Sequence, residues 1–253
     1  MKRTLSMVYA VACYALALGA FAYGVGFVGN FGVPRSLDVG TRTPLGMALV
    51  IDALLLGVFA VQHSVMARAW FKRWWTRIIP PAIERSTFVL FASLALILMY
   101  WQWRPVGDVL WEVSGSARTL LIVLSLAGWL SVFASTFLTS HWDLFGLRQA
   151  WLYVKGEHNA GLPFSDRGFY KMVRHPIYLG FTVAFWATPT MTMGHLVFAV
   201  ATLLYMLTAI QFEERDLVRI YGDVYRAYRE RVAMILPVPR RSASAGEPRA
   251  ERV

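Results

Sequence analysis

Charged residues are scarce in this chain, and their scarcity narrows the class of protein. Only 16% of the 253 residues are Asp, Glu, Lys or Arg, whereas 57% are hydrophobic. This composition excludes an ordinary soluble domain, which needs more polar surface. The formal net charge is +10, but the basic residues lie between apolar segments. A nucleic-acid partner is therefore not expected, since such proteins carry a basic stripe on a soluble fold.

Cysteine and clustered metal ligands are also lacking. Cys13 is the single cysteine and lies in the first apolar run, so no internal disulfide can form. No group of histidines and cysteines has the spacing of metal ligands. We therefore predict neither a disulfide framework nor a bound metal.

Long apolar runs are what the chain has in abundance. A membrane-spanning helix needs roughly 20 mainly apolar residues, and six runs approach this length: Ser6–Val28, Leu45–Met66, Ser86–Trp103, Leu120–Ser140, Ile177–Met193 and His195–Phe212. The first run is too long for a signal peptide and lacks a cleavage site, so we interpret it as a retained helix. The last two runs almost touch and Pro189 interrupts the fifth, so they form either two crossings or a hairpin that does not fully cross.

The basic residues predict an orientation for these runs. Only four of the 25 Lys and Arg residues fall on one side of the predicted membrane: Arg35, Arg42, Arg104 and Arg118. Cytoplasmic loops carry the excess of Lys and Arg, so both termini are predicted to be cytoplasmic. The expected fold is an all-α transmembrane bundle of five or six helices, forming a single domain over 1–239 with a cytoplasmic C-terminal helix. The last residues, 240–253, have little to bury and are predicted to be disordered.

The segment Gly168–Gly180 has the features of an anion-binding helix start. Pro176 suits the first position of a helix, and the free N–H groups and the dipole there favour a negative group. Lys171 and Arg174 add positive charge, and Gly180 permits a close approach of a ligand or another helix. The same features also fit a basic anchor at the membrane surface followed by a proline-started helix.

Two adjacent carboxylates, Glu213 and Glu214, lie where the last apolar run ends. Carboxylates at a membrane boundary are costly if they face lipid, so they should face water, a cavity or a cation. They would suit the ammonium end or the ribose hydroxyls of a cofactor, or they could simply begin a solvated helix. Three tyrosines share one face of the helix predicted to follow: Tyr221, Tyr225 and Tyr228.

Together these two blocks resemble a known family of membrane enzymes. The blocks are Gly168-x-Tyr170-x-x-Val173-Arg174-His175-Pro176-x-Tyr178-x-Gly180 and Glu213-Glu214-x-x-Leu217-x-x-x-Tyr221-Gly222-x-x-Tyr225-x-x-Tyr228, ending at Ile235-Leu236-Pro237. They are similar to those of isoprenylcysteine carboxyl methyltransferase and its bacterial relatives. The resemblance implies S-adenosylmethionine as the methyl donor, S-adenosylhomocysteine as a product, and a donor-binding part over about 160–237. The donor-binding residues that it implies are Arg174, His175, Tyr178, Gly180, Glu213, Glu214, Tyr225 and Tyr228.

A narrower resemblance comes from earlier in the chain. The blocks Gln62–Arg68, Pro81-x-x-Glu84-Arg85 and Thr139–Gln149 resemble the nurim-related branch, which includes bacterial methanethiol S-methyltransferases. This resemblance implies a bacterial inner-membrane enzyme that methylates a small volatile thiol, most narrowly methanethiol to dimethyl sulfide. The alternatives are another lipophilic acceptor, such as an isoprenoid thiol, a carboxylate or a lipid amine, or a non-enzymatic scaffold like nurim.

A thiol acceptor would need a base, because it reacts as its thiolate. Our candidates are His141 held by Asp143, or His63, and Arg148 could stabilise the anion. Each has a simpler interpretation. His63 could be a hydrogen-bonded contact between helices, and Asp143 could belong to a surface turn.

Overall fold

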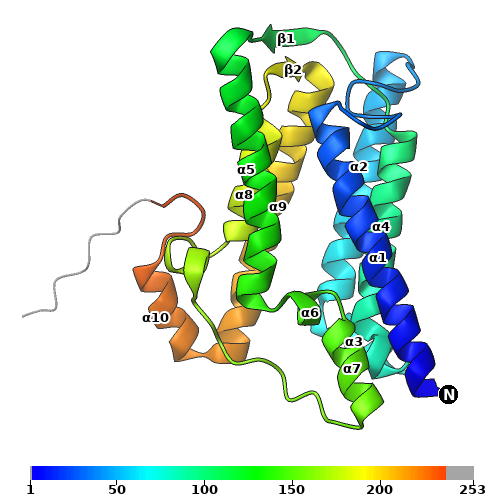
Figure 1. Cartoon of the computed structure of the whole chain (residues 1–253), viewed down its shortest axis with the longest axis vertical. Coiled ribbons are helices and arrows are strands. Elements are labelled where there is room, and N and C mark those ends of the chain that lie inside the picture. The colour runs from blue at the N-terminus through cyan, green and yellow to red at the C-terminus, as the bar shows by residue number, and fades with distance from the viewer. Residues whose placement is uncertain (1, 238–253) are drawn as a thin grey trace, which may run out of the picture.

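The computed structural model describes residues 2–237, which form an elongated helical bundle (Figure 1). Within this range, five helices are long and apolar enough to cross a membrane: α1 (Lys2–Gly29), α2 (Leu45–Ala67), α4 (Pro81–Gln102), α5 (Gly115–Thr139) and α9 (Met193–Tyr221). The predicted all-α membrane bundle is confirmed. The predicted tail over 240–253 lies outside the described residues, and the single domain stays a prediction.

The two ends of the bundle differ in their secondary structure. At one end β1 (Val109–Glu112) and β2 (Thr190–Thr192) form a two-stranded antiparallel sheet, and we call this the sheet end. The opposite end, called the α10 end, has short helices (Figure 1). These are α3 (Ala69–Trp75), α6 (His141–Leu144), α7 (Leu147–Lys155) and α10 (Asp223–Arg231).

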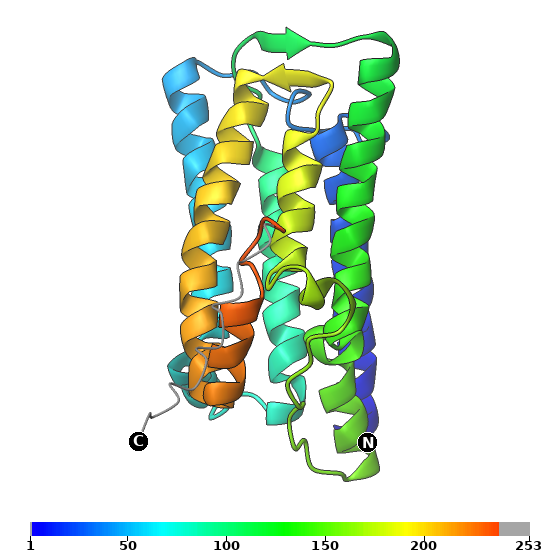
Figure 2. The same cartoon turned by 90° about the vertical axis from the view of Figure 1, so that its left-hand side faces the viewer.

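The fifth apolar run forms a helix that is too short to cross. Helix α8 (Pro176–Trp186) has 11 residues, or about 16 Å at 1.5 Å per residue, against roughly 30 Å of hydrocarbon. It runs from about mid-height to the sheet end (Figure 2). The helix predicted up to Met193 stops early, because the Pro189 carbonyl accepts a hydrogen bond from the N–H of Val113 and the chain then pairs as β2. Of the two alternatives for the last two runs, the structure favours the hairpin: α9 is long enough to cross the membrane, and α8, which the fifth run forms, is not.

The largest apolar core lies toward the sheet end. It contains residues from all five long helices and α8, most of which contribute aromatic rings. Phe198 of α9 is central, with ring centroids 5.1 Å from Phe185 and 5.7 Å from Trp103. Trp129 of α5 adds an edge contact to Phe185 at 5.6 Å. Since these rings are buried, this half of the bundle is closed by packing.

Helices α5 and α8 approach so closely that glycine is needed on both. A Cβ built on Gly128 would lie 2.7 Å from the backbone of Gly180 and of Ala184. A Cβ on Gly180 would lie 2.5 Å from the Ser131 hydroxyl. Such distances leave no room for a side chain, so this contact fixes α8 and the residues just before it against α5.

The helix predicted to follow Glu213 and Glu214, with its three tyrosines on one face, is broken in two. Helix α9 continues to Tyr221, and Gly222 then adopts a φ of 57°, in the left-handed region that favours glycine. Helix α10 starts at Asp223. The turn brings α10 back beside the start of α8, where the candidate site lies.

Candidate functional site

Glu214 is the centre of a buried ionic cluster. Arg174 donates from Nε to Glu214 Oε1 over 2.7 Å, and His175 Nε2 lies 3.1 Å from the same oxygen. Arg229 Nε lies 3.1 Å from Oε2. The Arg174 Nη1 atom donates to the carbonyls of Arg229 and Val232. Because the side chains of Arg174 and Glu214 are only 5% and 6% exposed, this carboxylate is already fully occupied by protein partners.

The chain after α10 is fastened to the same cluster by its backbone. The N–H of Arg174 donates to the carbonyl of Ala233 over 2.8 Å, and that of His175 donates to Met234 over 3.1 Å. These two N–H groups come just before Pro176, at which the predicted anion-binding helix start begins. The structure uses these two groups, and the Arg174 guanidinium, to hold the end of the described chain against α8. The donor-binding role of Arg174 stays a prediction, but its guanidinium is already bonded to Glu214 and to two backbone carbonyls.

Glu213 has the opposite character. Its side chain is 46% exposed, and its one hydrogen bond among the described residues is from the Tyr178 hydroxyl, at 3.0 Å. Burial raises the pKa of Tyr170, and the nearby Glu213 carboxylate raises it further, although a hydrogen bond with Thr139 opposes this. Glu213 is thus the carboxylate of the pair that keeps acceptor capacity for a ligand.

The two tyrosines of α10 are both buried, but only one is satisfied. Tyr225 and Tyr228 are 1% and 2% exposed and pack on Phe164. The Tyr228 hydroxyl donates to the Tyr170 carbonyl over 2.6 Å. The Tyr225 hydroxyl has no partner among the described residues. Burial raises the pKa of both tyrosines, so both are neutral. A buried polar group without a partner requires an explanation, and a bound ligand would supply one.

The structure therefore brings together seven of the eight predicted donor-binding residues. The exception is Gly180, whose Cα faces α5, so that the helix contact accounts for its lack of a side chain. Its predicted role toward a donor stays a prediction.

His141 is buried and its ring is fully engaged. Nε2 lies 2.8 Å from the Tyr14 hydroxyl and Nδ1 lies 2.7 Å from the Thr136 hydroxyl. The ring is stacked on Phe137 at 4.0 Å. Burial lowers the pKa of His141, which keeps it neutral. Asp143 is not among its hydrogen-bond partners, so the predicted pairing of these two residues is not the geometry observed.

Asp143 is instead paired with its own downstream segment. Arg148 Nη1 lies 3.0 Å from its carboxylate and also donates to the Asn159 side chain over 2.9 Å. Gln149 donates to the same carboxylate oxygen at 3.1 Å. Arg148, predicted to stabilise an anion, is therefore already partly neutralised.

His63 differs from His141 because one of its ring nitrogens is uncommitted. The ring lies on Phe59 and Phe88, with centroids 5.2 and 4.9 Å away. Its Nδ1 is buried and has no hydrogen-bond partner among the described residues. The neighbouring Ser64 makes the contact with α9, where its hydroxyl lies 3.3 Å from that of Tyr205. Of the two histidines predicted as bases, His63 is the one with a nitrogen that can accept a proton without losing a hydrogen bond.

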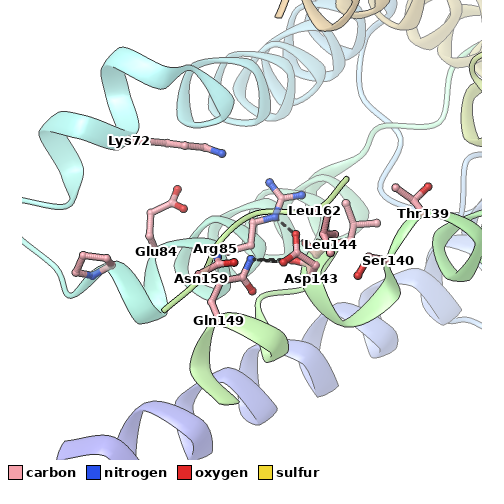
Figure 3. Close-up of a pocket in the computed structure, with 11 residues that line it drawn as sticks. Lys72, Glu84, Arg85, Thr139, Ser140, Asp143, Leu144, Gln149, Asn159 and Leu162 are labelled. Atoms are coloured by element: carbon pink, nitrogen blue, oxygen red, sulfur yellow. Dashed lines mark hydrogen bonds between the residues drawn. The ribbon is translucent and has the colours of Figure 1, made fainter. Parts of the chain in front are cut away.

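A cavity of about 430 Å³ opens at the α10 end (Figure 3). The polar side chains that line it include Lys72, Glu84, Arg85, Asp143, Gln149 and Asn159. Sequence reasoning noted the Glu84-Arg85 pair within a motif but gave it no role. The cavity is assembled from α3, α4, the end of α5, α6, α7 and the segment after α7, so no local sequence pattern reveals it.

Comparison with known proteins identifies the family of the chain. A family model described as phospholipid methyltransferase matches residues 119–224. A methanethiol S-methyltransferase of Mycobacterium tuberculosis is 54% identical over 95% of this chain and 99% of the relative. The chain belongs to the methanethiol S-methyltransferase family. A second member of this family, from Bradyrhizobium diazoefficiens, is 52% identical over 91% of the chain and 89% of the relative.

Nurim of Mus musculus is a more distant relative of this methyltransferase family. It is 31% identical to the chain over 71% of each protein. No solved structure matches the chain. The narrower resemblance predicted from the earlier sequence blocks, to the nurim-related branch that includes methanethiol S-methyltransferases, is confirmed. The chain is a multi-pass membrane protein.

Proposed function

We propose that the chain transfers the methyl group of S-adenosylmethionine to methanethiol, giving dimethyl sulfide and S-adenosylhomocysteine. The observation that carries this proposal is the similarity to relatives bearing that name over nearly the whole chain. The charged and unsatisfied groups at the α10 end supply the local chemistry.

The donor would be held by Glu213 and Tyr225. The half-exposed Glu213 carboxylate can accept hydrogen bonds from ribose hydroxyls, or pair with an ammonium group. The buried Tyr225 hydroxyl has no hydrogen-bond partner among the described residues, and a bound ligand could provide one. The cluster around Glu214 acts through these two by fixing α9, α10 and the start of α8 to one another. When bound, the donor supplies an electrophilic methyl group on a sulfonium.

The chain's own contribution is to orient the acceptor and remove its proton. The thiolate sulfur forms a bond to the methyl carbon, while the bond from that carbon to the sulfonium breaks and its electron pair stays on the departing sulfur. Holding the two sulfur atoms in line across the methyl group supplies much of the acceleration. His63 would take the thiol proton on Nδ1, which has no other partner among the described residues.

The α10 end is proposed to face the cytoplasm of a bacterial inner membrane. Among the described residues, the basic ones at the sheet end are Arg35, Arg42, Arg104 and Arg118, and the others lie toward the α10 end. The excess of positive charge marks the cytoplasmic side. A water-soluble donor would then reach the site from the cytoplasm, and a small apolar thiol from the bilayer.

The proposal is tested by headspace gas chromatography of purified protein in detergent, given S-adenosylmethionine and methanethiol. Dimethyl sulfide is expected from the unmodified protein and strongly reduced in Glu213→Gln. If S-adenosylhomocysteine binds but no dimethyl sulfide forms, methanethiol is not the acceptor, and an isoprenoid thiol, a carboxylate or a lipid amine should be tried. If neither donor nor product binds, a nurim-like scaffold is the better description.

A further inference from the structure

The amino-acid end of the proposed donor needs partners of both signs, because it carries a carboxylate and an ammonium group. Arg174 was the cation that the sequence suggested for the carboxylate. Its guanidinium is buried and already bonded to Glu214 and to two backbone carbonyls. If the proposed function is right, another cation must therefore meet the donor's carboxylate.

The size of the cavity at the α10 end suits the donor better than the acceptor. Its volume is about 430 Å³, within the range of roughly 300–1,000 Å³ typical of pockets for drug-sized ligands. Methanethiol, with one carbon and one sulfur, would leave most of this space unfilled. Most of its lining residues are polar or charged, which also favours a charged ligand.

Three charged side chains that line this cavity form no ion pair with any of the described residues. Figure 3 shows Lys72, Glu84 and Arg85 around the same space. Arg85 donates from Nε to the Leu144 carbonyl over 2.7 Å, but its two terminal nitrogens have no hydrogen bond or ion pair among the described residues. Its guanidinium carbon lies 4.6 Å from the centre of the Phe88 ring. Arg85 is thus held in place with its terminal N–H groups unused.

Lys72 and Arg85 influence each other's charge near the cavity. Burial lowers the pKa of Lys72, and the positive charges of Arg85 and Arg68 lower it further, whereas the carboxylates of Glu84 and Asp143 oppose this. An anion bound beside Lys72 and Arg85 would stabilise the charged form of both.

The cavity also adjoins the part of the site assigned to the donor. Thr139 lines the cavity, and its hydroxyl donates to the Tyr170 hydroxyl over 2.7 Å. The carbonyl of Tyr170 in turn accepts a hydrogen bond from the Tyr228 hydroxyl of α10 over 2.6 Å. Tyr170 therefore contacts both the wall of the cavity and a tyrosine of the predicted donor site.

We propose that this cavity binds the zwitterionic amino-acid end of the methyl donor, with Arg85 pairing with the carboxylate and Glu84 with the ammonium group. This inference rests on the proposed function, because it takes a sulfonium nucleoside as the ligand. It assigns a binding role to two residues that lie more than 80 positions before the Arg-His-Pro block in the sequence.

Isothermal titration calorimetry with two ligands tests the assignment. S-adenosylhomocysteine contains the amino-acid end, whereas 5′-methylthioadenosine lacks it. Arg85→Met should weaken S-adenosylhomocysteine binding roughly ten- to hundredfold, the loss expected for a charged hydrogen-bonded pair, and should leave 5′-methylthioadenosine binding unchanged. Arg85→Lys should recover part of the affinity. Arg219→Met is the matched control, because this arginine pairs with Asp216 and neither residue lines the cavity, and it should change neither affinity.

The outcomes separate this inference from the function on which it rests. If S-adenosylhomocysteine binds Arg85→Met as tightly as the unmodified protein, the cavity assignment is wrong and the methyltransferase proposal is untouched. Equal weakening of both ligands would also overturn it, since Arg85 would then act only on the fold. Failure of the unmodified protein to bind either ligand would overturn the proposed function itself.

Discussion

Buried polar side chains serve different purposes at the two ends of this bundle. At the sheet end they satisfy backbone groups. Asp52 accepts from the N–H of Arg104 at 2.9 Å, and His195 Nε2 lies 2.8 Å from the Phe185 carbonyl. Each of these contacts fixes a helix end or a loop, which accounts for the presence of ionisable residues in an apolar bundle.

At the α10 end the polar side chains face one another or face a cavity. Glu214 is saturated by cationic partners, whereas Lys72, Glu84 and Arg85 line a cavity and form no ion pair within the described part of the chain. Groups that are satisfied within the protein can hold a fold, and groups that are not are available to a ligand. The comparison teaches that stability should depend on polar residues at both ends, but methyl transfer only on those at the α10 end.

Histidines from the two ends give the largest expected contrast. His63→Gln should lower kcat for dimethyl sulfide formation by roughly 10²–10⁴-fold, the usual contribution of a general base, with little change in thermal stability. His195→Gln should instead lower stability, because its ring bonds the backbone. Activity assays and thermal unfolding in detergent measure the two effects. A normal kcat in His63→Gln would remove that residue from the mechanism.

Substitutions of the two adjacent carboxylates should have different effects, one on stability and the other on donor affinity. Glu214→Gln breaks a buried pair with Arg174 and should cost on the order of 3–5 kcal/mol of unfolding free energy. Glu213→Gln changes a half-exposed group and should leave stability nearly intact while weakening donor binding. Denaturant unfolding in detergent and calorimetry test the pair. Equal stability losses in both variants would contradict the division of roles.

The glycine contact between α5 and α8 should tolerate no added carbon. Gly128→Ala should destabilise the protein by about 1–3 kcal/mol, the usual cost of overpacking, because its Cβ would lie 2.7 Å from backbone atoms of α8. Gly19→Ala is the control within another long helix, since nothing lies within 4 Å of its Cβ. The melting temperatures of the two variants check this. A stable Gly128→Ala would show that α8 can move away from α5.

The tyrosines of α10 give the smallest effect and the finest comparison. Tyr228→Phe loses the hydrogen bond to the Tyr170 carbonyl and should cost about 0.5–1.5 kcal/mol. Tyr225→Phe loses a hydroxyl without a protein partner among the described residues, so stability should be unchanged or slightly higher. Its S-adenosylhomocysteine affinity should fall. If donor affinity is unaffected, another group must account for the buried Tyr225 hydroxyl.

Much of the fold and part of the site could be predicted from local sequence. The apolar runs gave the long helices, and Pro176 begins α8 at its first position as predicted. The break in the last helix at Gly222 was missed, because a helical periodicity of tyrosines continues across it. The early end of α8 was left open between a full crossing and a hairpin, since it depends on pairing with β1, nearly 80 residues earlier in the chain.

The sequence by itself determined that this is a membrane bundle with a methyltransferase motif, because hydrophobicity, proline position and motif order are local properties. Only the tertiary structure decided which charges are free. Glu213 and Glu214 are indistinguishable as neighbours in the sequence, yet one is saturated by Arg174 and the other is half-exposed. Likewise, contacts between distant segments engage both ring nitrogens of His141. They also hold Arg85 by its Nε and leave its terminal nitrogens without a partner among the described residues. Availability for chemistry is set by what lies within hydrogen-bond distance, which long-range packing alone decides.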